Sequence, residues 1–216
     1  MQKTSLETTS LAIPLKIGIT GGIGSGKTTV SKIFEILGIP VYYADNRAKS
    51  IMEQEGEVKN RINRLFGKEA YFQNGGLNRK YIAGVVFQDK TKLEKLNAIV
   101  HPAVIKDGEA WFAEQHGTPY CLKEAALLIE SGSYKTLDAL IVVTAPQPLR
   151  IERVMKRDGL KKTDVIARLK SQGPEEEKLR LADFVIQNDG SQSLIKQVLE
   201  THQQIVSTWA KALKNN

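Results

Sequence analysis

The sequence predicts an α/β fold built on a five-stranded parallel sheet. Short apolar runs alternate with stretches of helical periodicity from residue 15 onward, which is the pattern of a parallel sheet flanked by helices. The run Leu-Ile-Val-Val at residues 140–143 is continuously apolar, as expected for a strand that is buried on both faces. Together these observations favour a sheet with helices on its two sides.

The first part of the predicted core holds two strands and one helix. Residues 15–20 form the first strand, and the helix over residues 27–37 stops at Gly38, a typical helix terminator. The second strand covers residues 39–43 and ends at Ala44-Asp45. The polar side chain at this strand end is therefore a candidate for the functional edge of the sheet.

Residues 46–112 show helical patterns without a convincing strand, so we expect a helical insertion there. Its breaks are predicted at Gly56, Gly67, residues 74–76 and His101-Pro102.

The other three strands are predicted at residues 119–124, 140–143 and 182–187. A turn at 188–190 and an amphipathic helix over 191–213 complete the chain. The expected organisation is thus a polar arm (1–14), a core (15–45, 113–147 and 181–216), a helical insertion (46–112) and a basic segment (148–180).

Composition indicates a globular protein of ordinary kind. The chain has 216 residues, of which 41% are hydrophobic and 25% charged. No apolar run approaches the length that crosses a bilayer, and residues 1–14 lack the apolar core of a signal peptide. The single cysteine, Cys121, permits no internal disulfide and falls in a predicted strand, where a buried structural thiol is expected. We therefore expect a cytoplasmic protein with no membrane segment.

The net charge of +7 is compatible with a nucleic acid or with a small polyanionic substrate. No long basic run and no RNA-binding motif with interleaved aromatic residues is present. Charge spread along helix surfaces is the favoured explanation, and we expect no nucleic-acid partner.

The most informative stretch lies between the first strand and the first helix. It reads Gly21, Gly22, Ile23, Gly24, Ser25, Gly26, Lys27, Thr28 and Thr29. It matches the phosphate-binding loop G-x-x-x-x-G-K-[ST], in which glycines let backbone N–H groups curl around a triphosphate and the helix adds the positive end of its dipole. Lys27 is expected to reach the β- and γ-phosphates and the Thr28 hydroxyl to help hold Mg²⁺. The alternative, a glycine turn that binds nothing, is disfavoured by the complete match in this context.

The segment 148–180 is rich in arginine and lysine. Arg153 and Arg157 are four residues apart and share a helix face. Such a pair can clamp a transferring phosphoryl group, and the segment could close as a lid that excludes water. The alternative is a solvated helix with arginine–glutamate pairs. Arg157 is the preferred candidate because Asp158 could orient it.

Phosphoryl transfer to a hydroxyl also requires a group that receives the proton. Asp45 is the leading candidate, since the ligand crevice of a parallel sheet lies at the carboxyl ends of its strands. The competing interpretation is an N-cap for a helix that begins near Asn46. Glu124, near the end of the third strand, could assist Mg²⁺ through water or could be a surface residue.

Seven spaced motifs carry a resemblance to a known family. They lie at residues 18–30 (the glycine-rich loop), 43–45 (Tyr-Ala-Asp), 86–87 (Val-Phe), 96–102 (ending in His-Pro), 127–130 (Leu-Leu-Ile-Glu), 153–158 (ending in Arg-Asp) and 182–190 (ending in Asn-Asp-Gly). Across residues 15–213 the chain resembles the dephospho-CoA kinase family. The loop alone is shared by many kinases, whereas the spaced set is much more specific.

The resemblance implies a reaction, a fold and a division into parts. ATP would phosphorylate the ribose 3′-hydroxyl of dephospho-CoA, giving CoA and ADP, with Mg²⁺ required. The fold would be that of an adenylate-kinase-like P-loop kinase, with residues 46–112 as a helical CoA-binding domain and residues 148–180 as a lid. A monomer is expected.

The resemblance also assigns roles to residues of the core and lid. Asp45 matches the proposed catalytic base, which favours that role over helix capping. Arg157 and Arg153 belong to the lid motif that ends in Arg-Asp. Asn188 would lie near the adenine, through backbone contacts.

Three further positions match the family on its substrate side. His101 would contact substrate or cap a helix before a proline break. Arg79 would pair with a substrate phosphate or form a surface ion pair, and Glu130 would act on substrate or in the structure. Two residues depart from the family pattern: Tyr43 replaces an aspartate, which removes an assisting carboxylate, and Ala126 replaces a proline.

Two other functions remain possible from the residues alone. Another small-molecule kinase, for nucleosides or nucleoside monophosphates, would share the loop and the lid. A nucleotide-dependent, nucleic-acid-binding ATPase would use the basic charge, although no guanine-reading or nucleic-acid module is present.

Overall fold

The structure is a computed structural model that describes residues 13–54 and 56–214, with side chains described as far as residue 208. Residues 1–12, most of the arm expected over 1–14, lie outside the described residues. The chain divides into two compact units. The first contains the described parts of residues 1–41 and 114–216, and the second contains residues 42–113.

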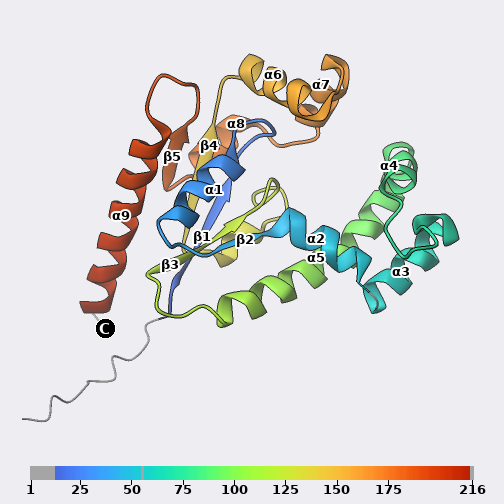
Figure 1. The fold of residues 1–216 in the computed structure, drawn as a ribbon, viewed down its shortest axis with the longest axis horizontal. Coiled ribbons are helices and arrows are strands. Elements are labelled where there is room, and N and C mark those ends of the chain that lie inside the picture. Colours follow the sequence, from blue (N-terminus) through green and yellow to red (C-terminus); the bar gives the residue numbers. More distant parts are fainter. Residues whose placement is uncertain (1–12, 55, 215–216) are drawn as a thin grey trace, which may run out of the picture. The chain divides into compact units, whose positions relative to one another are not determined.

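The first unit is built on the five-stranded sheet, which confirms the predicted α/β class (Figure 1). Its strands are β1 (Leu15–Thr20), β2 (Val41–Tyr43), β3 (Tyr120–Glu124), β4 (Ala139–Thr144) and β5 (Phe184–Gln187), in the order β2-β3-β1-β4-β5. β1 pairs in parallel with β3 and β4, and β4 pairs in parallel with β5. The chain passes from the first unit into the second within β2.

The main hydrophobic core of the first unit lies on the sheet. Residues 140–143 of β4 are all buried, as the continuous apolar run predicts. α1 (Lys27–Ile36) and α9 (Leu194–Lys214) pack together on one face, where Phe34 and Val198 join Ile17 and Ile141 in a single cluster. Cys121 is fully buried in β3, and burial raises the pKa of its thiol to about 11, so it is not a thiolate nucleophile.

Three helices lie between β4 and β5: α6 (Gln147–Asp158), α7 (Lys162–Lys170) and α8 (Glu175–Arg180). α6 and α7 form their own small hydrophobic cluster around Val154 and Val165. The short 3-10 helix η2 (Ser133–Thr136) precedes β4.

The second unit is helical, with α2 (Ala44–Glu53), α3 (Glu57–Phe66), α4 (Arg79–Gln88), α5 (Lys90–Ala113) and the 3-10 turn η1 (Lys68–Ala70). Its core includes Ile62, Phe66, Ile82 and Ile99. Among the helices that the structure describes, none is long and apolar enough to cross a membrane.

Three boundary predictions in this region are wrong. The second strand ends at Tyr43 as expected but begins at Val41 and not at residue 39, and the next helix, α2, begins at Ala44 and not near Asn46, with Tyr43 as its N-cap residue. Asp45 therefore lies inside the first helical turn and is not the cap. The break at His101-Pro102 is also absent, since α5 continues through Pro102. Burial of the neighbouring Ile99 and Val100 against the core offsets the lost backbone hydrogen bond, while His101 and Pro102 face solvent.

His202 of α9 gives the fold a pH-dependent contact. Its Nδ1 atom lies 2.8 Å from the hydroxyl of the fully buried Tyr120, and burial lowers the pKa of the imidazole below its usual value of about 6.5. Because the unfolded chain then binds more protons than the folded chain as pH falls below about 6.5, the free energy of unfolding should decrease over that range. Urea unfolding at pH 7.5, 6.5 and 5.5 checks this.

His202→Gln is the informative variant for that measurement, because glutamine does not titrate. We expect its stability to fall less between pH 7.5 and 5.5 than that of the wild type. The matched control is His116→Gln, since His116 is exposed, and it should keep the wild-type slope. Equal slopes for His202→Gln and the wild type would contradict the assignment.

Candidate functional site

The glycine-rich loop lies between β1 and α1, at the edge formed by the carboxyl ends of the strands. Gly26 is the N-cap residue of α1 and has a left-handed backbone, with φ at 96° and no side chain capping the helix. A Cβ atom at Gly26 would approach Asn188 Nδ2 to 2.1 Å, so only glycine fits. The uncapped N–H groups of the first turn and the positive end of the helix dipole make this a site for an anion.

Lys27 and two threonines complete the loop. The Lys27 ammonium donates a hydrogen bond to the Gly21 carbonyl oxygen at 3.0 Å, so its side chain curls over the loop. Thr28 and Thr29 are exposed in the first turn of α1. The expected phosphate-binding residues are thus together in one loop, with the charged and hydroxyl groups at the helix N-terminus.

Two residues from later in the chain support the loop. The Asn188 side chain donates to the Ser25 carbonyl oxygen at 2.8 Å, and it therefore touches the loop in addition to any backbone contact with a nucleotide. The Gln172 Oε1 atom accepts a hydrogen bond from the Ile23 N–H at 2.8 Å. The Ile23 side chain packs against the α6–α7 cluster, so the loop and the basic segment share a hydrophobic contact.

Arg150 lies directly against the loop. Its side chain is 9% exposed, and Nη2 lies 2.5 Å from Glu175 Oε2. The guanidinium passes so close to Gly22 that a Cβ atom there would lie 1.7 Å from Nη1. The Thr144 hydroxyl donates to the other oxygen of Glu175. This chain of contacts links the end of β4, the start of α6 and the start of α8.

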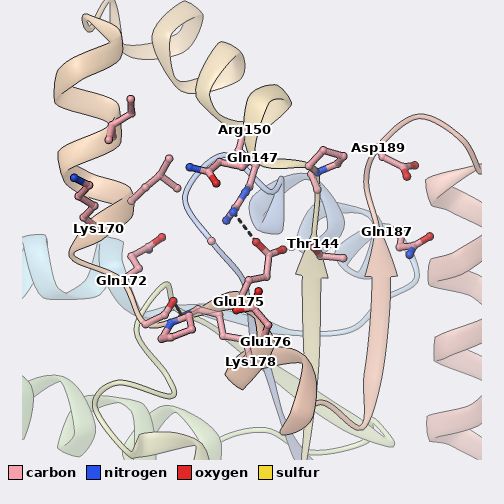
Figure 2. Close-up of a pocket in the computed structure, with 17 residues that line it drawn as sticks. Thr144, Gln147, Arg150, Lys170, Gln172, Glu175, Glu176, Lys178, Gln187 and Asp189 are labelled. Carbon is pink, nitrogen blue, oxygen red and sulfur yellow. Dashed lines mark hydrogen bonds and ion pairs between the residues drawn. The ribbon is translucent and has the colours of Figure 1, made fainter.

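A cavity of about 540 Å³ opens beside these residues (Figure 2), a volume typical of small-molecule sites. Figure 2 shows polar side chains that line it, among them Gln147, Arg150, Lys170, Gln172 and Glu175. Among the described residues, four buried side-chain polar atoms lack a hydrogen-bond partner: Ser25 Oγ, Ser31 Oγ, Arg150 Nε and Arg153 Nη1. Ser25 belongs to the loop, and Arg150 lines the cavity. Buried donors without partners are costly unless a ligand satisfies them.

The two predicted lid arginines differ in their surroundings. Arg157 is 63% exposed and forms a bidentate contact with Asp158, at 2.7 Å from Nε and 3.0 Å from Nη2. The Asp158 carboxylate also accepts from Arg168, and the hydrogen bond from Arg157 lowers the pKa of Asp158. Asp158 thus does contact and orient Arg157. Arg153 is partly buried, with the unpartnered nitrogen described above.

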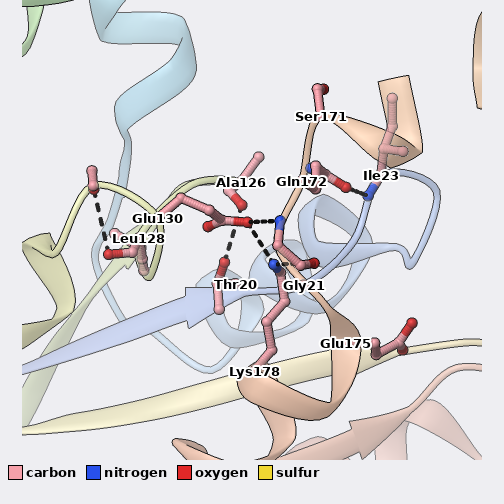
Figure 3. A network of polar contacts seen from close by, with 12 residues as sticks. Thr20, Gly21, Ile23, Ala126, Leu128, Glu130, Ser171, Gln172, Glu175 and Lys178 are labelled. Atoms are coloured by element: carbon pink, nitrogen blue, oxygen red, sulfur yellow. Dashed lines mark hydrogen bonds and ion pairs between the residues drawn. The ribbon is translucent and has the colours of Figure 1, made fainter. Parts of the chain in front are cut away.

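Glu130 is the centre of a polar network that connects the loop after β3 to α8 (Figure 3). Its Oε1 atom accepts hydrogen bonds from the Lys178 ammonium at 2.5 Å and from the Gly173 N–H at 2.9 Å. The Lys178 side chain is only 2% exposed and also donates to the Gly173 carbonyl oxygen. Burial acts to raise the pKa of Glu130, but these hydrogen bonds and the charge of Lys178 outweigh it and hold the pKa low. This engagement favours the structural alternative for Glu130.

Asp45, Arg79 and His101 all lie in the second unit. Asp45 is exposed in the first turn of α2. Arg79 Nη2 lies 3.1 Å from Glu53 Oε1, and this is the surface ion pair that was the alternative for Arg79. His101 is exposed within α5, so it does not cap a helix end.

Comparison with known proteins decides the family. A family model described as dephospho-CoA kinase matches residues 15–193. The chain belongs to the dephospho-CoA kinase family. A dephospho-CoA kinase of Bacteroides fragilis is 39% identical over 186 residues, which cover 86% of this chain and 90% of the relative. Members of the family are ATP-dependent kinases, and this chain is therefore an ATP-dependent phosphotransferase.

Solved structures similar to this chain agree with its assignment to the dephospho-CoA kinase family. The crystal structure of TT1252 from Thermus thermophilus has a TM-score of 0.80 at 36% identity and covers 89% of this chain and 98% of that one. A dephospho-CoA kinase from Campylobacter jejuni has a TM-score of 0.65 at 29% identity, with the same coverage.

The sequence prediction for this dephospho-CoA kinase family member missed Arg150, Glu175, Gln172 and Lys178. Arg150 carried a usable signal. It occupies the helical stripe of Ile151 and Val154, the buried face of α6, and an arginine on an apolar face implies a buried partner. Gln172 and Lys178 carried none, because their partners lie 149 and 48 residues away in sequence.

Proposed function

We propose that this chain transfers the γ-phosphoryl group of ATP to the ribose 3′-hydroxyl of dephospho-CoA, giving CoA and ADP. The observation that carries the proposal is the uncapped N-terminus of α1 behind a glycine loop, beside a polar cavity, in a chain of this family. Family membership favours this reaction over a nucleoside kinase and over a nucleic-acid-binding ATPase. We expect a cytoplasmic monomer without a nucleic-acid partner.

Within this proposal, the residues of the first unit bind the nucleotide. The loop amides of residues 21–29 and the Lys27 ammonium hold the β- and γ-phosphates. Arg153 and Arg157 neutralise charge on the transferring group, and the unpartnered Arg153 Nη1 supports a ligand contact. The Asn188 backbone lies on the adenine side.

The residues of the second unit serve the acceptor. Asp45 aligns the 3′-hydroxyl and takes its proton. Its exposed carboxylate is available for that contact. His101 and Arg79 contact the substrate, and Arg79 would exchange its surface partner Glu53 for a phosphate. We propose that Glu130 stabilises the lid through its ion pair with Lys178 and does not contact the substrate.

The residues present fit a loosely held Mg²⁺. No group of three or more histidine, cysteine, aspartate or glutamate side chains that could hold a metal occurs within the described part of the chain. Magnesium tolerates this, because it retains several waters and often takes only one or two protein ligands beside substrate phosphates. The exposed Thr28 hydroxyl would be the protein ligand. When bound, the ion neutralises charge on the phosphate oxygens.

Mass spectrometry of the product after incubation with ATP, Mg²⁺ and dephospho-CoA tests the proposal. We expect a mass increase of one phosphoryl group on dephospho-CoA and none on AMP or uridine. Phosphorylation of AMP or uridine in preference to dephospho-CoA would establish the nucleoside or nucleotide kinase alternative. ATP consumption without any small-molecule acceptor would favour the ATPase alternative.

Arg150→Lys should weaken ATP binding. In the wild type, Arg150 contacts Glu175 through Nη2, and its Nε donor has no protein partner and is available to a ligand. Lysine keeps the charge but has a single ammonium group, which cannot make both contacts. Loss of about one such hydrogen bond corresponds to roughly a tenfold rise in KM for ATP. Steady-state kinetics with varied ATP checks this, with Arg180→Lys on the exposed face of α8 as the control. An unchanged KM would remove Arg150 from the nucleotide site.

A further inference from the structure

The first turn of α2 is fastened to α5 by one carboxylate. Asp107 Oδ2 accepts a hydrogen bond from the Tyr42 hydroxyl at 2.6 Å and one from Arg47 Nε at 2.8 Å. Arg47 Nη2 contacts the other oxygen, Oδ1, which makes the arginine–carboxylate contact bidentate. The Tyr42 hydroxyl also lies 3.2 Å from the Val104 carbonyl oxygen. These residues all belong to the second unit.

Packing fixes the tyrosine in this position. Tyr42 is 2% exposed, and its ring centroid lies 5.5 Å from that of Trp111. Gly108 of α5 faces the same ring, at a distance where an added Cβ atom would make an ordinary van der Waals contact, 3.5 Å from the ring carbons. α5 therefore offers a fitted surface as well as a hydrogen-bond acceptor. Packing thus fixes Tyr42, whereas Arg47, with its side chain 45% exposed, is held by its two contacts with Asp107.

The charge states at neutral pH favour these hydrogen bonds. The hydrogen bond from Arg47 lowers the pKa of Asp107, and burial together with the hydrogen bond to Asp107 raises the pKa of Tyr42. At neutral pH the carboxylate is ionised and the phenol keeps its proton, so Asp107 accepts from both neighbours. Bidentate arginine–carboxylate contacts of this kind hold geometry as well as charge.

We propose that Asp107, through Tyr42 and Arg47, is a positioning residue for Asp45. The two anchors stand three residues before and two residues after Asp45 in the sequence, so they hold both sides of the turn that carries it. Asp45 itself is exposed and is not held by this cluster directly. The inference rests on the proposed role of Asp45 as the base. Catalytic groups require placement to a fraction of an ångström, which neighbouring hydrogen bonds supply.

Kinetics of Asp107→Asn, Tyr42→Phe and Arg47→Met test the proposal on the full chain. We expect kcat to fall about tenfold for Asp107→Asn and less for the single-anchor variants, with KM for ATP and for dephospho-CoA within twofold of the wild type. Arg47→Lys should retain more activity than Arg47→Met. Tyr81→Phe is the matched control, because it removes a tyrosine hydroxyl bond, to the Phe66 carbonyl oxygen, elsewhere in the same unit.

A double-mutant cycle separates positioning from a general structural effect. If Asp107 acts through Asp45, adding Asp107→Asn to Asp45→Ala should lower kcat no further. Equal losses in the two backgrounds, or an Asp107→Asn enzyme with wild-type kcat, would overturn the proposal.

Hydrogen exchange gives a readout that needs no activity. Amides of residues 47–50, the first in α2 that donate to a helix carbonyl, should exchange faster in Asp107→Asn, while those of α3 and α4 stay at the wild-type rate. Unchanged exchange at residues 47–50 would overturn the positioning role even in an active enzyme. Absence of CoA formation by the wild type would instead overturn the proposed function, so the two failures are distinguishable.

Discussion

Asp45→Ala is expected to lower kcat by about 10²–10⁴, the usual contribution of a positioned general base. The reason is that the 3′-hydroxyl would lose both its alignment and its proton acceptor. KM for ATP should change little, because the nucleotide contacts belong to the loop in the other unit. Steady-state kinetics with saturating dephospho-CoA measures the effect.

The control for this variant is Glu57→Ala. Glu57 is an exposed acid in the first turn of the ten-residue helix α3, as Asp45 is in the ten-residue helix α2. Both substitutions remove a negative charge near a helix N-terminus, so their effects on stability through the helix dipole should be similar. Only the Asp45 variant should lose turnover. Near-normal turnover in Asp45→Ala would exclude the residue as the base.

Glu130→Gln should reduce the free energy of unfolding by about 2 kcal/mol, between the values for a surface pair and a buried pair, because only the Lys178 side chain is buried while that of Glu130 is 22% exposed. The cause is that the Lys178 side chain, 2% exposed, would keep its charge without a counter-ion. Urea denaturation at neutral pH measures the change. The surface pair Lys196–Glu200, with side chains 77% and 56% exposed, provides the comparison: Glu200→Gln should change stability by about 0.5 kcal/mol or less.

The double variant Glu130→Gln/Lys178→Met identifies the mechanism of that loss. Methionine removes the unpaired charge and keeps most of the apolar stem, so the double variant should be more stable than Glu130→Gln alone. A double variant less stable than the single one would show that Lys178 contributes mainly through its bond to the Gly173 carbonyl oxygen.

Local patterns in the sequence were sufficient for much of the fold. The strand at 15–20, the helix stop at Gly38 and the loop before Lys27 each depend on neighbours in the chain, and all three occur as expected. Pro102 shows the limit of this reasoning. A proline predicts a helix end from local chemistry, whereas the tertiary packing of α5 keeps the helix continuous.

Motif reasoning predicted best the part of the site whose residues follow one another in sequence. The loop residues were found because they are contiguous. Arg150 and Glu175 form their pair across 25 residues, and the Lys178–Glu130 contact spans 48. Such contacts depend on how α6 and α8 meet the sheet, which no local motif specifies. The roles of Asp45, His101 and Arg79 toward the substrate stay predictions, and the Asp45→Ala kinetics test the first of them.

The residues that contact the glycine loop from outside are synthesised much later than the loop itself. The loop is complete by residue 29, yet Gln172 and Asn188 form hydrogen bonds to it, and Arg150 lies against it, from the last third of the sequence. A nascent polypeptide therefore lacks the full nucleotide cradle until residue 188 has emerged from the ribosome. Truncated products that end before that point should not sequester ATP.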